Sequence, residues 1–144
     1  MEGVTLEADA TLRAGAQVTV VDDLTVNGTL LLNRTSTTTQ SIYDVGLNFA
    51  AGYQTLGGTG EIQLFNAYTA GFAERYLRIR AVKNGQLTIG PDLTVRNVGG
   101  SAAVGDSSSS RPLINQGTIS SETPGQMLAV RGSSIFNEGS LQVS

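Results

Sequence analysis

The sequence has no cysteine, no histidine and no tryptophan, and only 15% of its 144 residues are charged. Without cysteine there is neither a disulfide nor thiolate chemistry, and without histidine the usual nucleophilic triads and zinc sites have no basis. We therefore expect no catalytic residue, no metal site and no cofactor. The net charge of −3 argues against nucleic acid as a main partner, since phosphate binding depends on an excess of lysine and arginine.

No run of about 18 apolar residues is present, so we expect no membrane-spanning helix. Glycine supplies 18 residues, aromatic residues make up only 6%, and serine, threonine and asparagine fill most of the remaining polar positions. This composition is typical of an all-β protein with many turns. The length suits one domain with a core but is short for two, so we expect a single domain over residues 1–144.

Large aliphatic residues recur every six positions at the start of the sequence, and mostly small residues follow them by four. The series is Leu6, Leu12, Val18, Leu24 and Leu30, with Ala10, Ala16, Asp22 and Gly28 after the first four. A helix would need a period near 3.6, which this series does not keep. The rhythm predicts short strands separated by bends, in which three sides close a triangular coil and successive coils stack as parallel strands.

Within the predicted sides, aliphatic residues alternate with threonine. The four triplets are Val18-Thr19-Val20, Leu24-Thr25-Val26, Leu87-Thr88-Ile89 and Leu93-Thr94-Val95. The pattern predicts half-buried strands that point aliphatic side chains inward and threonine outward. The outward threonines would form an ice-binding face only if they made one flat array, which the irregular coil lengths argue against.

A turn containing asparagine or glycine precedes an aliphatic strand residue five times along the sequence. The aliphatic residues are Leu30, Ile62, Leu93, Ile119 and Leu141, separated by 32, 31, 26 and 22 positions. The shortest step fits a coil of three short strands, and the longer steps fit coils with inserted loops. Asn115 and Asn137, in two of these turns, are either ordinary turn residues or rungs of a ladder of stacked asparagine side chains.

Two low-complexity stretches, Thr35–Gln40 and Gly99–Ser110, are predicted to be loops at coil corners. Between residues 43 and 76 the sequence holds seven of its eight aromatic residues. Four of these have the helical spacing of three, four and four positions, namely Phe65, Tyr68, Phe72 and Tyr76. We expect a short inserted helix or loop in this middle region, with rings that either plug the space against the coil wall or form a platform for a sugar.

Four of the nine positively charged residues lie between Arg75 and Lys83. On a strand, Arg78 and Arg80 would point outward, either as part of a solvated face or as a basic strip that contacts an anionic glycan or an acidic partner. The candidate ligand-binding residues predicted from the sequence are therefore Tyr68, Phe72, Tyr76, Arg78 and Arg80.

No pattern in the sequence predicts catalysis. Asp22-Asp23 is the only adjacent acidic pair, and neighbouring strand residues point to opposite faces, so the pair does not by itself build a two-carboxylate site. Arg78-Ile79-Arg80 is similar to the Arg-Ile-Lys element of polygalacturonase-like enzymes, but the His-Gly element of that family is missing. We expect that the protein is not an enzyme, with a polysaccharide hydrolase or lyase as a less favoured alternative.

The segments Val18–Val20, Asp23–Leu30, Leu56–Ile62, Asn115–Ile119 and Asn137–Leu141 resemble the repeats of bacterial autotransporter passengers and filamentous-haemagglutinin-like adhesins. The resemblance is one of repeat style and covers most of the chain except the aromatic middle. It implies a single-stranded right-handed parallel β-helix, secretion, and a role in adhesion or surface structure. Leu6-Glu7-Ala8-Asp9-Ala10 also fits the left-handed hexapeptide helix, a family whose acyltransferases commonly use a catalytic histidine that this sequence lacks.

The repeats begin by Val4 and leave no room for a signal peptide, while Leu141-Gln142-Val143-Ser144 is still in strand alternation. We expect either a cytoplasmic protein or, in preference, a trimmed segment of a secreted one at the cell surface. Its partners would be other copies of itself or neighbouring solenoid segments, in a longer solenoid or in a fibre of stacked subunits. The leading hypothesis is a structural or adhesive module of an extracellular bacterial surface protein or fibre. The alternative is a carbohydrate-binding module with glycans as partners.

Overall fold

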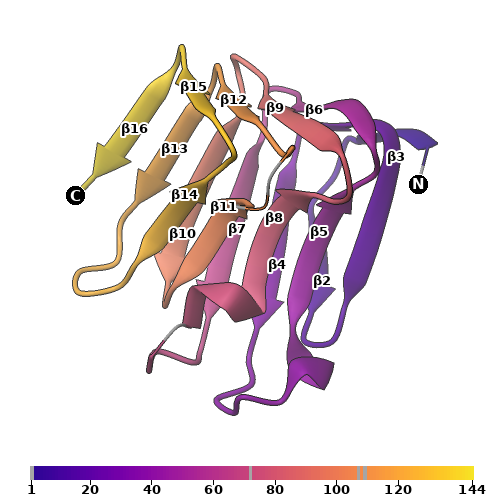
Figure 1. The fold of residues 1–144 in the computed structure, drawn as a ribbon. Coiled ribbons are helices and arrows are strands. Elements are labelled where there is room, and N and C mark those ends of the chain that lie inside the picture. The colour runs from indigo at the N-terminus through magenta and orange to yellow at the C-terminus, as the bar shows by residue number, and fades with distance from the viewer. Residues whose placement is uncertain (1, 72, 107, 109) are drawn as a thin grey trace.

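The computed structural model describes residues 2–71, 73–106, 108 and 110–144, which are almost entirely in β-strands and turns (Figure 1). The strands form three sets along the molecule, which we name the first, second and third face. The first face contains β1 (Glu2–Leu6), the second half of β3 (Gln17–Val26), β6 (Gly52–Gly57), β9 (Gly85–Ile89), β12 (Leu113–Asn115) and β15 (Ile135–Asn137). The second face contains β2 (Ala10–Arg13), β4 (Thr29–Arg34), β7 (Glu61–Asn66), β10 (Thr94–Gly99), β13 (Thr118–Ser121) and β16 (Ser140–Val143). The third face contains the first half of β3, β5 (Val45–Phe49), β8 (Leu77–Ala81), β11 (Ala102–Gly105) and β14 (Leu128–Arg131).

The paired strands run parallel to one another on all three faces. On the second face, for example, β4 pairs with β7, β7 with β10, β10 with β13 and β13 with β16. Neighbouring parallel strands need a crossover between them, and the strands of the other two faces lie within these crossovers. The all-β class with parallel sheets, predicted from the sequence, is confirmed.

The strand β3 belongs to two faces because it turns a corner. Its residues Gln17–Val20 pair with β5, whereas Leu24–Thr25 pair with β6. Between them Asp22 and Asp23 have φ angles of 59° and 60°, a left-handed conformation that aspartate tolerates better than most residues. This corner joins the first and third faces into one ten-stranded sheet.

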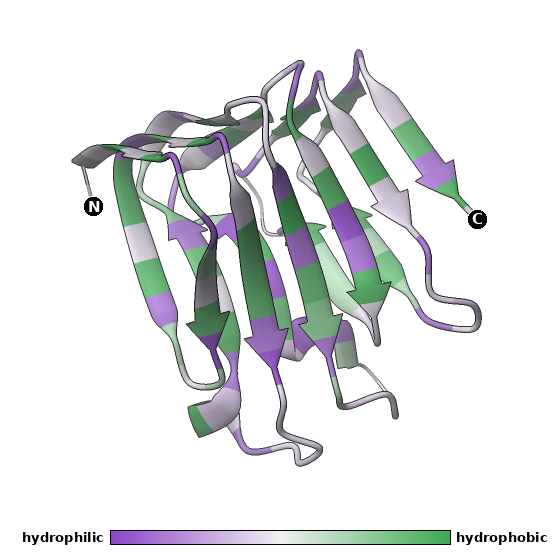
Figure 2. Ribbon diagram, turned by 180° about the vertical axis from the view of Figure 1, so that it is seen from behind, coloured by the Kyte–Doolittle hydropathy of each residue, from purple (hydrophilic) through white to green (hydrophobic). Residues whose placement is uncertain are grey.

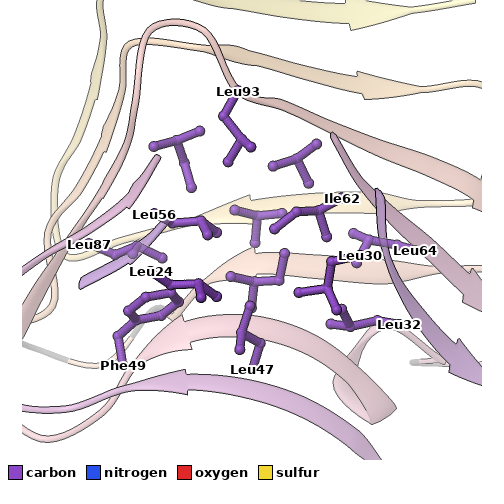
Figure 3. Packing of buried hydrophobic residues seen from close by; sticks show 14 of the residues in the cluster. Leu24, Leu30, Leu32, Leu47, Phe49, Leu56, Ile62, Leu64, Leu87 and Leu93 are labelled. Carbon is purple, nitrogen blue, oxygen red and sulfur yellow. The ribbon is translucent and has the colours of Figure 1, made fainter. Parts of the chain in front are cut away.

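Inward-pointing aliphatic residues from the three faces meet in one core (Figure 3). Leu24 and Leu30 of the six-residue series are buried, whereas Leu6, Leu12 and Val18 are partly buried and pack against the same core. Figure 2 shows the hydrophobic and hydrophilic residues alternating along the strands. Because each fully buried leucine stabilises the fold by about 1.5–3 kcal/mol, this core is the main source of stability. The inward direction of the series is confirmed.

The turn motif predicts the cross-strand register correctly except at Leu93. Leu30 pairs with Ile62, and Ile119 with Leu141, as the spacing indicates. Ile62 pairs with Val95, however, so Leu93 of the turn motif lies two residues before the cross-strand partner of Ile62. The reason is a longer turn: the Leu93 N–H donates to the Gly90 carbonyl at 3.3 Å, and β10 begins only after it.

One of the two predicted loops contains a strand of the core. Thr35–Gln40 lies outside the strands, as expected. The prediction for Gly99–Ser110 is wrong in its middle, because β11 lies there and Ala102 and Val104 are part of the core. Glycine, alanine and serine are typical of loops, yet alanine also fills a strand position where space is small.

The helical spacing of Phe65, Tyr68, Phe72 and Tyr76 does not correspond to one helix. Phe65 is in β7, and Phe72 lies outside the described residues. A short 3-10 helix, η2 (Ala73–Tyr76), follows, and a second one, η1 (Ser41–Tyr43), precedes β5. In the part of the chain that the structure describes, no helix is long and apolar enough to cross a membrane.

The outward threonines are distributed over all three faces. Thr19 is on the third face, Thr25 and Thr88 are on the first, and Thr94 is on the second. They therefore make no single flat array, and the ice-binding hypothesis loses its geometric basis.

We call three strands that follow one another in the chain, one from each face, a level. The asparagine ladder is present between β12 and β15, which belong to the last two levels of the first face. Asn115 and Asn137 are cross-strand partners, and Asn115 Nδ2 donates to Asn137 Oδ1 at 2.7 Å. Asn115 is fully buried, and its partner on the other side is Ile89. Of the two alternatives, the ladder is confirmed.

Replacing Leu24 by aspartate tests the inward assignment of the series. Leu24 is 1% exposed, so Leu24→Asp would bury a charge without a partner, and we expect it to destabilise the fold by about 4 kcal/mol or more. Thr5→Asp, at an exposed outward position on the same face, is the matched control and should cost less than about 0.5 kcal/mol. Urea unfolding followed by circular dichroism measures both. Equal midpoints for the two variants would contradict the assignment.

Candidate functional site

Two connections of equal length leave the same corner of the molecule, between the second and the third face. Residues 35–44 link β4 to β5, and residues 67–76 link β7 to β8. Both extend from the lower end of the strands in Figure 1. Arg34 and Asn66, the last residues of β4 and β7, are cross-strand partners, so the two connections begin side by side. This corner brings together several polar and aromatic side chains.

Arg34 ends β4 with a side chain that is fully buried. Its terminal nitrogens donate to the carbonyls of Ser36 and Thr38, at 2.6 Å each. One of them also reaches Asn66 Oδ1 at 3.4 Å, and Asp44 Oδ1 lies 3.7 Å from Nε. A buried charge is stable only when it is paired and hydrogen-bonded, and the first connection provides both here.

Two tyrosine rings of the second connection complete the surroundings of Arg34. The guanidinium carbon lies 4.8 Å from the ring centroid of Tyr76 and 5.8 Å from that of Tyr68. The two rings meet edge to face, with centroids 5.4 Å apart. A cation within about 6 Å of an aromatic face is attracted by the ring, so both rings stabilise the buried charge. We name Arg34, Asp44, Asn66, Tyr68 and Tyr76 the Arg34 cluster.

Asn66 fixes the backbone of the second connection. Its Nδ2 donates to the carbonyls of Ala73 at 2.9 Å and Ser101 at 2.8 Å, and its Oδ1 accepts from the Tyr68 N–H at 3.0 Å. One buried amide therefore links this connection to the core of the next level. Arg34 therefore holds the first connection in place, and Asn66 holds the second.

Burial also changes the acid of the cluster. It raises the pKa of Asp44, against the opposing charges of Arg34 and Arg78, which favour the ionised carboxylate. The cluster thus has an internal cation that faces rings and carbonyls, and an acid that is partly withdrawn from water. The side chains of the cluster contact one another and the backbone, so the cluster resembles a structural contact inside the protein more than an open ligand site.

The sequence-predicted site residues are divided between two places. Tyr68 and Tyr76 come together in the Arg34 cluster, where both are half-buried. Phe72 lies outside the described residues. Arg78 and Arg80 are on β8, on the outer side of the third face. The four described residues therefore lie in two places, and the role of the predicted residues in ligand binding stays a prediction.

Arg80 is part of a chain of polar contacts along the third face. Its Nε donates to Asn48 Oδ1 at 3.0 Å, and Asn48 Nδ2 donates to Gln17 Oε1 at 3.1 Å. At the other end, Arg80 pairs with Asp106 at 3.3 Å. The chain spans several levels, so the Arg80 charge is engaged within the protein.

For Arg78, two residues earlier on β8, burial lowers the pKa of the guanidinium, and the like charge of Arg80 acts in the same direction. The charges of Asp106 and Asp44 act in the opposite direction. The predicted basic strip is thus partly neutralised by acids from two connections.

Asp106 is shared between two arginines. It lies 3.3 Å from Arg80 and 2.8 Å from Arg111. Burial acts to raise its pKa, but hydrogen bonds from Ser108 and the two positive charges outweigh that effect and hold the pKa below its usual value. The carboxylate therefore stays ionised and ties β8 to the segment before β12.

Other ion pairs also cross between levels. Arg96 on β10 pairs with Glu61 of β7 at 3.1 Å and with Glu122, just after β13, at 2.6 Å. The hydrogen bond that Arg96 donates lowers the pKa of Glu122, and the hydrogen bonds that Arg96 donates to Glu122 and Glu61 raise its own pKa. Glu74 of η2, which is 2% exposed, pairs with Arg131 of β14 at 2.9 Å. The Arg96 pairs join strands of successive levels, whereas the Glu74–Arg131 pair spans two levels, since β11 lies between β8 and β14.

The adjacent acidic pair Asp22-Asp23 forms the corner of β3. The Asp23 carboxylate accepts from the Thr55 N–H, and the Asp23 N–H donates to Gln54 Oε1 at 3.0 Å. In residues 2–71, 73–106, 108 and 110–144 no group of three or more acidic side chains is arranged to hold a metal ion. The absence of catalysis stays a prediction.

Arg34 was missed by reasoning from the sequence, although a pattern could have found it. In Leu30-Leu31-Leu32-Asn33-Arg34, the alternation that points Leu30 and Leu32 inward points Arg34 inward as well. A charged residue at an inward strand position predicts a buried partner network. The partners themselves come from connections whose paths the sequence does not specify.

No protein-family model, no curated protein and no solved structure matches this chain. The function is therefore argued from the geometry of the molecule and from the repeat style of its sequence.

Replacing Arg34 tests whether the cluster holds the corner. Arg34→Met keeps the length of the side chain but leaves Asp44 and two carbonyls without their partner, so we expect a loss of about 3 kcal/mol in the free energy of unfolding. Arg13→Met, at an exposed position on the same face, is the control and should cost less than about 0.5 kcal/mol. Chemical denaturation gives both values, and a neutral Arg34→Met would show that the cluster adds no stability.

The lowered pKa of Asp106 predicts that the stability of the fold depends on pH. Its folded-state pKa is lowered, so the ionised carboxylate stabilises the fold above its ordinary pKa of about 4, and this contribution is lost as the pH falls through the lower folded pKa. Asp106→Asn should therefore be less stable than the wild type by about 1 kcal/mol near neutral pH, with the difference closing in acid. Thermal unfolding across pH measures this, with the exposed Asp92→Asn as control. A difference that does not vary with pH would refute the ionic role.

Proposed function

We propose that the chain is a single-stranded right-handed parallel β-helix and a structural module of an extracellular bacterial surface protein or fibre. The helical path is supported by the order of the strands, since the chain visits the first, second and third face in turn before it returns to the first. The right hand is supported by the general preference of parallel crossovers. The repeat style resembles that of surface adhesins, which supports the location.

The observation that carries the proposal is that both ends of the strand stack are open. At the C-terminal end, a hollow of about 220 Å³ reaches the core between Ile119, Leu128, Val130 and Leu141. Leu141 is 49% exposed, although its partner Ile119 is buried. Among the described strands, β14, β15 and β16 each have a neighbour on one side only, so their outer edges can accept further strands.

The N-terminal end has the matching features. β1 and β2 each pair with one strand among those described. The inward residues of this level pack on the core from one side and are only partly buried, namely Val4, Leu6, Ala10, Leu12 and Val18. The two ends therefore offer the same three parallel strands and the same inward aliphatic rows, with free backbone groups on facing edges.

The occupant that fits each end is a further coil of the same kind. For the chain by itself, this coil comes from a second copy stacked head to tail, with β15 of one copy beside β1 of the next. In a head-to-tail contact, the newly added copy still has one free end. Repeated addition therefore builds an open filament. In a longer solenoid, a neighbouring segment would occupy the same place and bury the same rows.

The proposal includes no catalytic activity. Asp23 holds a corner, and Asp106, Glu61 and Glu122 pair with arginines. These acids stabilise contacts between levels, which is the work expected of a structural module.

Leu141→Lys tests the stacking at the C-terminal end. Because Leu141 is half-exposed in the single chain, the lysine can reach water there, whereas a stacked coil would bury it without a partner. We expect the wild type to form unbranched assemblies that grow with concentration, and Leu141→Lys to stay monomeric. Analytical ultracentrifugation and negative-stain imaging measure both.

The control is Gln142→Lys, which adds the same charge to the next, outward residue of β16 and should assemble like the wild type. A wild type that stays strictly monomeric at high concentration would contradict head-to-tail stacking. Assemblies that survive Leu141→Lys would place the contact elsewhere and also contradict it.

A further inference from the structure

A second hollow lies on the outer side of the first face, away from both ends. It has a volume of about 320 Å³ and is lined by Tyr53, Asn84, Gln86, Ser110 and Pro112, together with two glycines. Small-molecule sites commonly have volumes of about 300–1,000 Å³, so this hollow is at the lower end of that range. Neither the predicted ligand-binding residues nor the Arg34 cluster contribute to its lining.

Gly52 and Gly85 both line the hollow, and neither position accepts a side chain without strain. Gly52 and Gly85 are cross-strand partners in β6 and β9. Gly52 has a φ of 98°, a conformation that other residues rarely adopt. A Cβ on Gly85 would lie 2.8 Å from the Ala50 carbonyl oxygen. The depression is therefore fixed by the backbone.

The wall of the hollow follows three successive levels. Tyr53 on β6 is the cross-strand partner of Gln86 on β9. Pro112 comes next, because its carbonyl accepts from the Leu87 N–H at 3.2 Å. With neighbouring strands about 4.8 Å apart, the three side chains cover roughly 10 Å along the molecule. This length suits a short linear ligand that runs parallel to the stack.

The polar groups at the hollow are neutral and available. Tyr53 is 86% exposed, although it is a large aromatic residue. Among the residues that the structure describes, the side-chain amides of Asn84 and Gln86 have no hydrogen-bond partner. Arg111, which lies between two lining residues in sequence, directs its guanidinium to Asp106 and to the Lys83 carbonyl. No charged residue lines the hollow itself.

We propose that this hollow is a binding site for an uncharged saccharide. The exposed Tyr53 ring offers an apolar face on which the C–H side of a sugar ring can stack. The amides of Asn84 and Gln86, which have no partner among the described residues, can both donate and accept hydrogen bonds. This matches the paired donor and acceptor character of sugar hydroxyls. The lack of charge in the lining disfavours an acidic glycan, because an anion would leave water without a compensating partner.

The Tyr53 hollow is distinct from the aromatic platform predicted from the sequence. Tyr68 and Tyr76 are half-buried and their rings already face the internal charge of Arg34, whereas Tyr53 faces water. The Tyr53 hollow also lies on a long side of the molecule, so it stays open when the ends are covered. The inference is therefore independent of the stacking described above.

A glycan array of neutral and acidic oligosaccharides, followed by NMR titration of the wild type with the best neutral hits, tests the site. We expect binding of neutral oligosaccharides with shifts centred on Tyr53 and Gln86. Tyr53→Ala should weaken binding at least tenfold, because the stacking surface is lost, and the exposed position lets the variant fold. Tyr53→Phe keeps the ring and should bind within about twofold of the wild type.

Tyr43→Ala, which removes an exposed tyrosine on η1, is the matched control and should leave binding unchanged. The proposal is overturned if no neutral oligosaccharide binds, or if Tyr53→Ala binds as well as the wild type. It is also overturned if only acidic glycans bind and Arg78→Ala or Arg80→Ala abolishes that binding, since the ligand would then lie on the third face.

Discussion

Backbone hydrogen bonds between strands that are distant in sequence hold every other feature of this protein in place. Cross-strand partners are 20 residues apart at the N-terminal end, as for Leu6 and Val26, and 33 residues apart in the middle, as for Ile62 and Val95. Only when this parallel ladder forms do the inward aliphatic residues of the three faces meet. A slip of one residue would turn each inward side chain outward, so burial of the core fixes the register. The asparagine ladder and the ion pairs between levels then follow from that register.

The ladder of backbone hydrogen bonds accommodates extra residues because these lie at the corners, outside the strands. Two ten-residue connections occur between the second and third faces, yet Arg34 and Asn66 on either side remain cross-strand partners. The entropic cost of closing a loop grows only slowly with its length, so insertions of this size disturb the strands little. Their backbone polar groups still need partners, and the buried Arg34 and Asn66 side chains supply several of them. In this way a charge inside the fold orders segments that lie outside the sheets.

The surface divides into regions of different chemistry. The two ends of the stack carry free strand edges and exposed aliphatic side chains, which favour further strands. The long sides carry hydroxyl, amide and paired ionic groups, which favour water and, at the Tyr53 hollow, a neutral polar ligand. A module with this division can be joined at its ends while its sides remain accessible. The net charge of −3 is low, so copies in the proposed stack would repel one another little.

The sequence by itself determined the strand period and the inward direction of residues such as Leu24 and Leu30, because side-chain alternation and turn residues act locally. For Asn115 and Asn137 it left a ladder and ordinary turns open, and the cross-strand register decided in favour of the ladder. The sequence did not determine that β11 lies within a glycine- and serine-rich stretch, since burial there depends on neighbouring levels. The place of Leu93 was also decided by the tertiary structure, because the length of one turn sets which residue enters the ladder. The surroundings of Arg34 and the hollow at Tyr53 come from segments tens of residues apart, namely two connections in one case and three levels of the first face in the other. Such sites arise from stacking, which no local pattern of residues specifies.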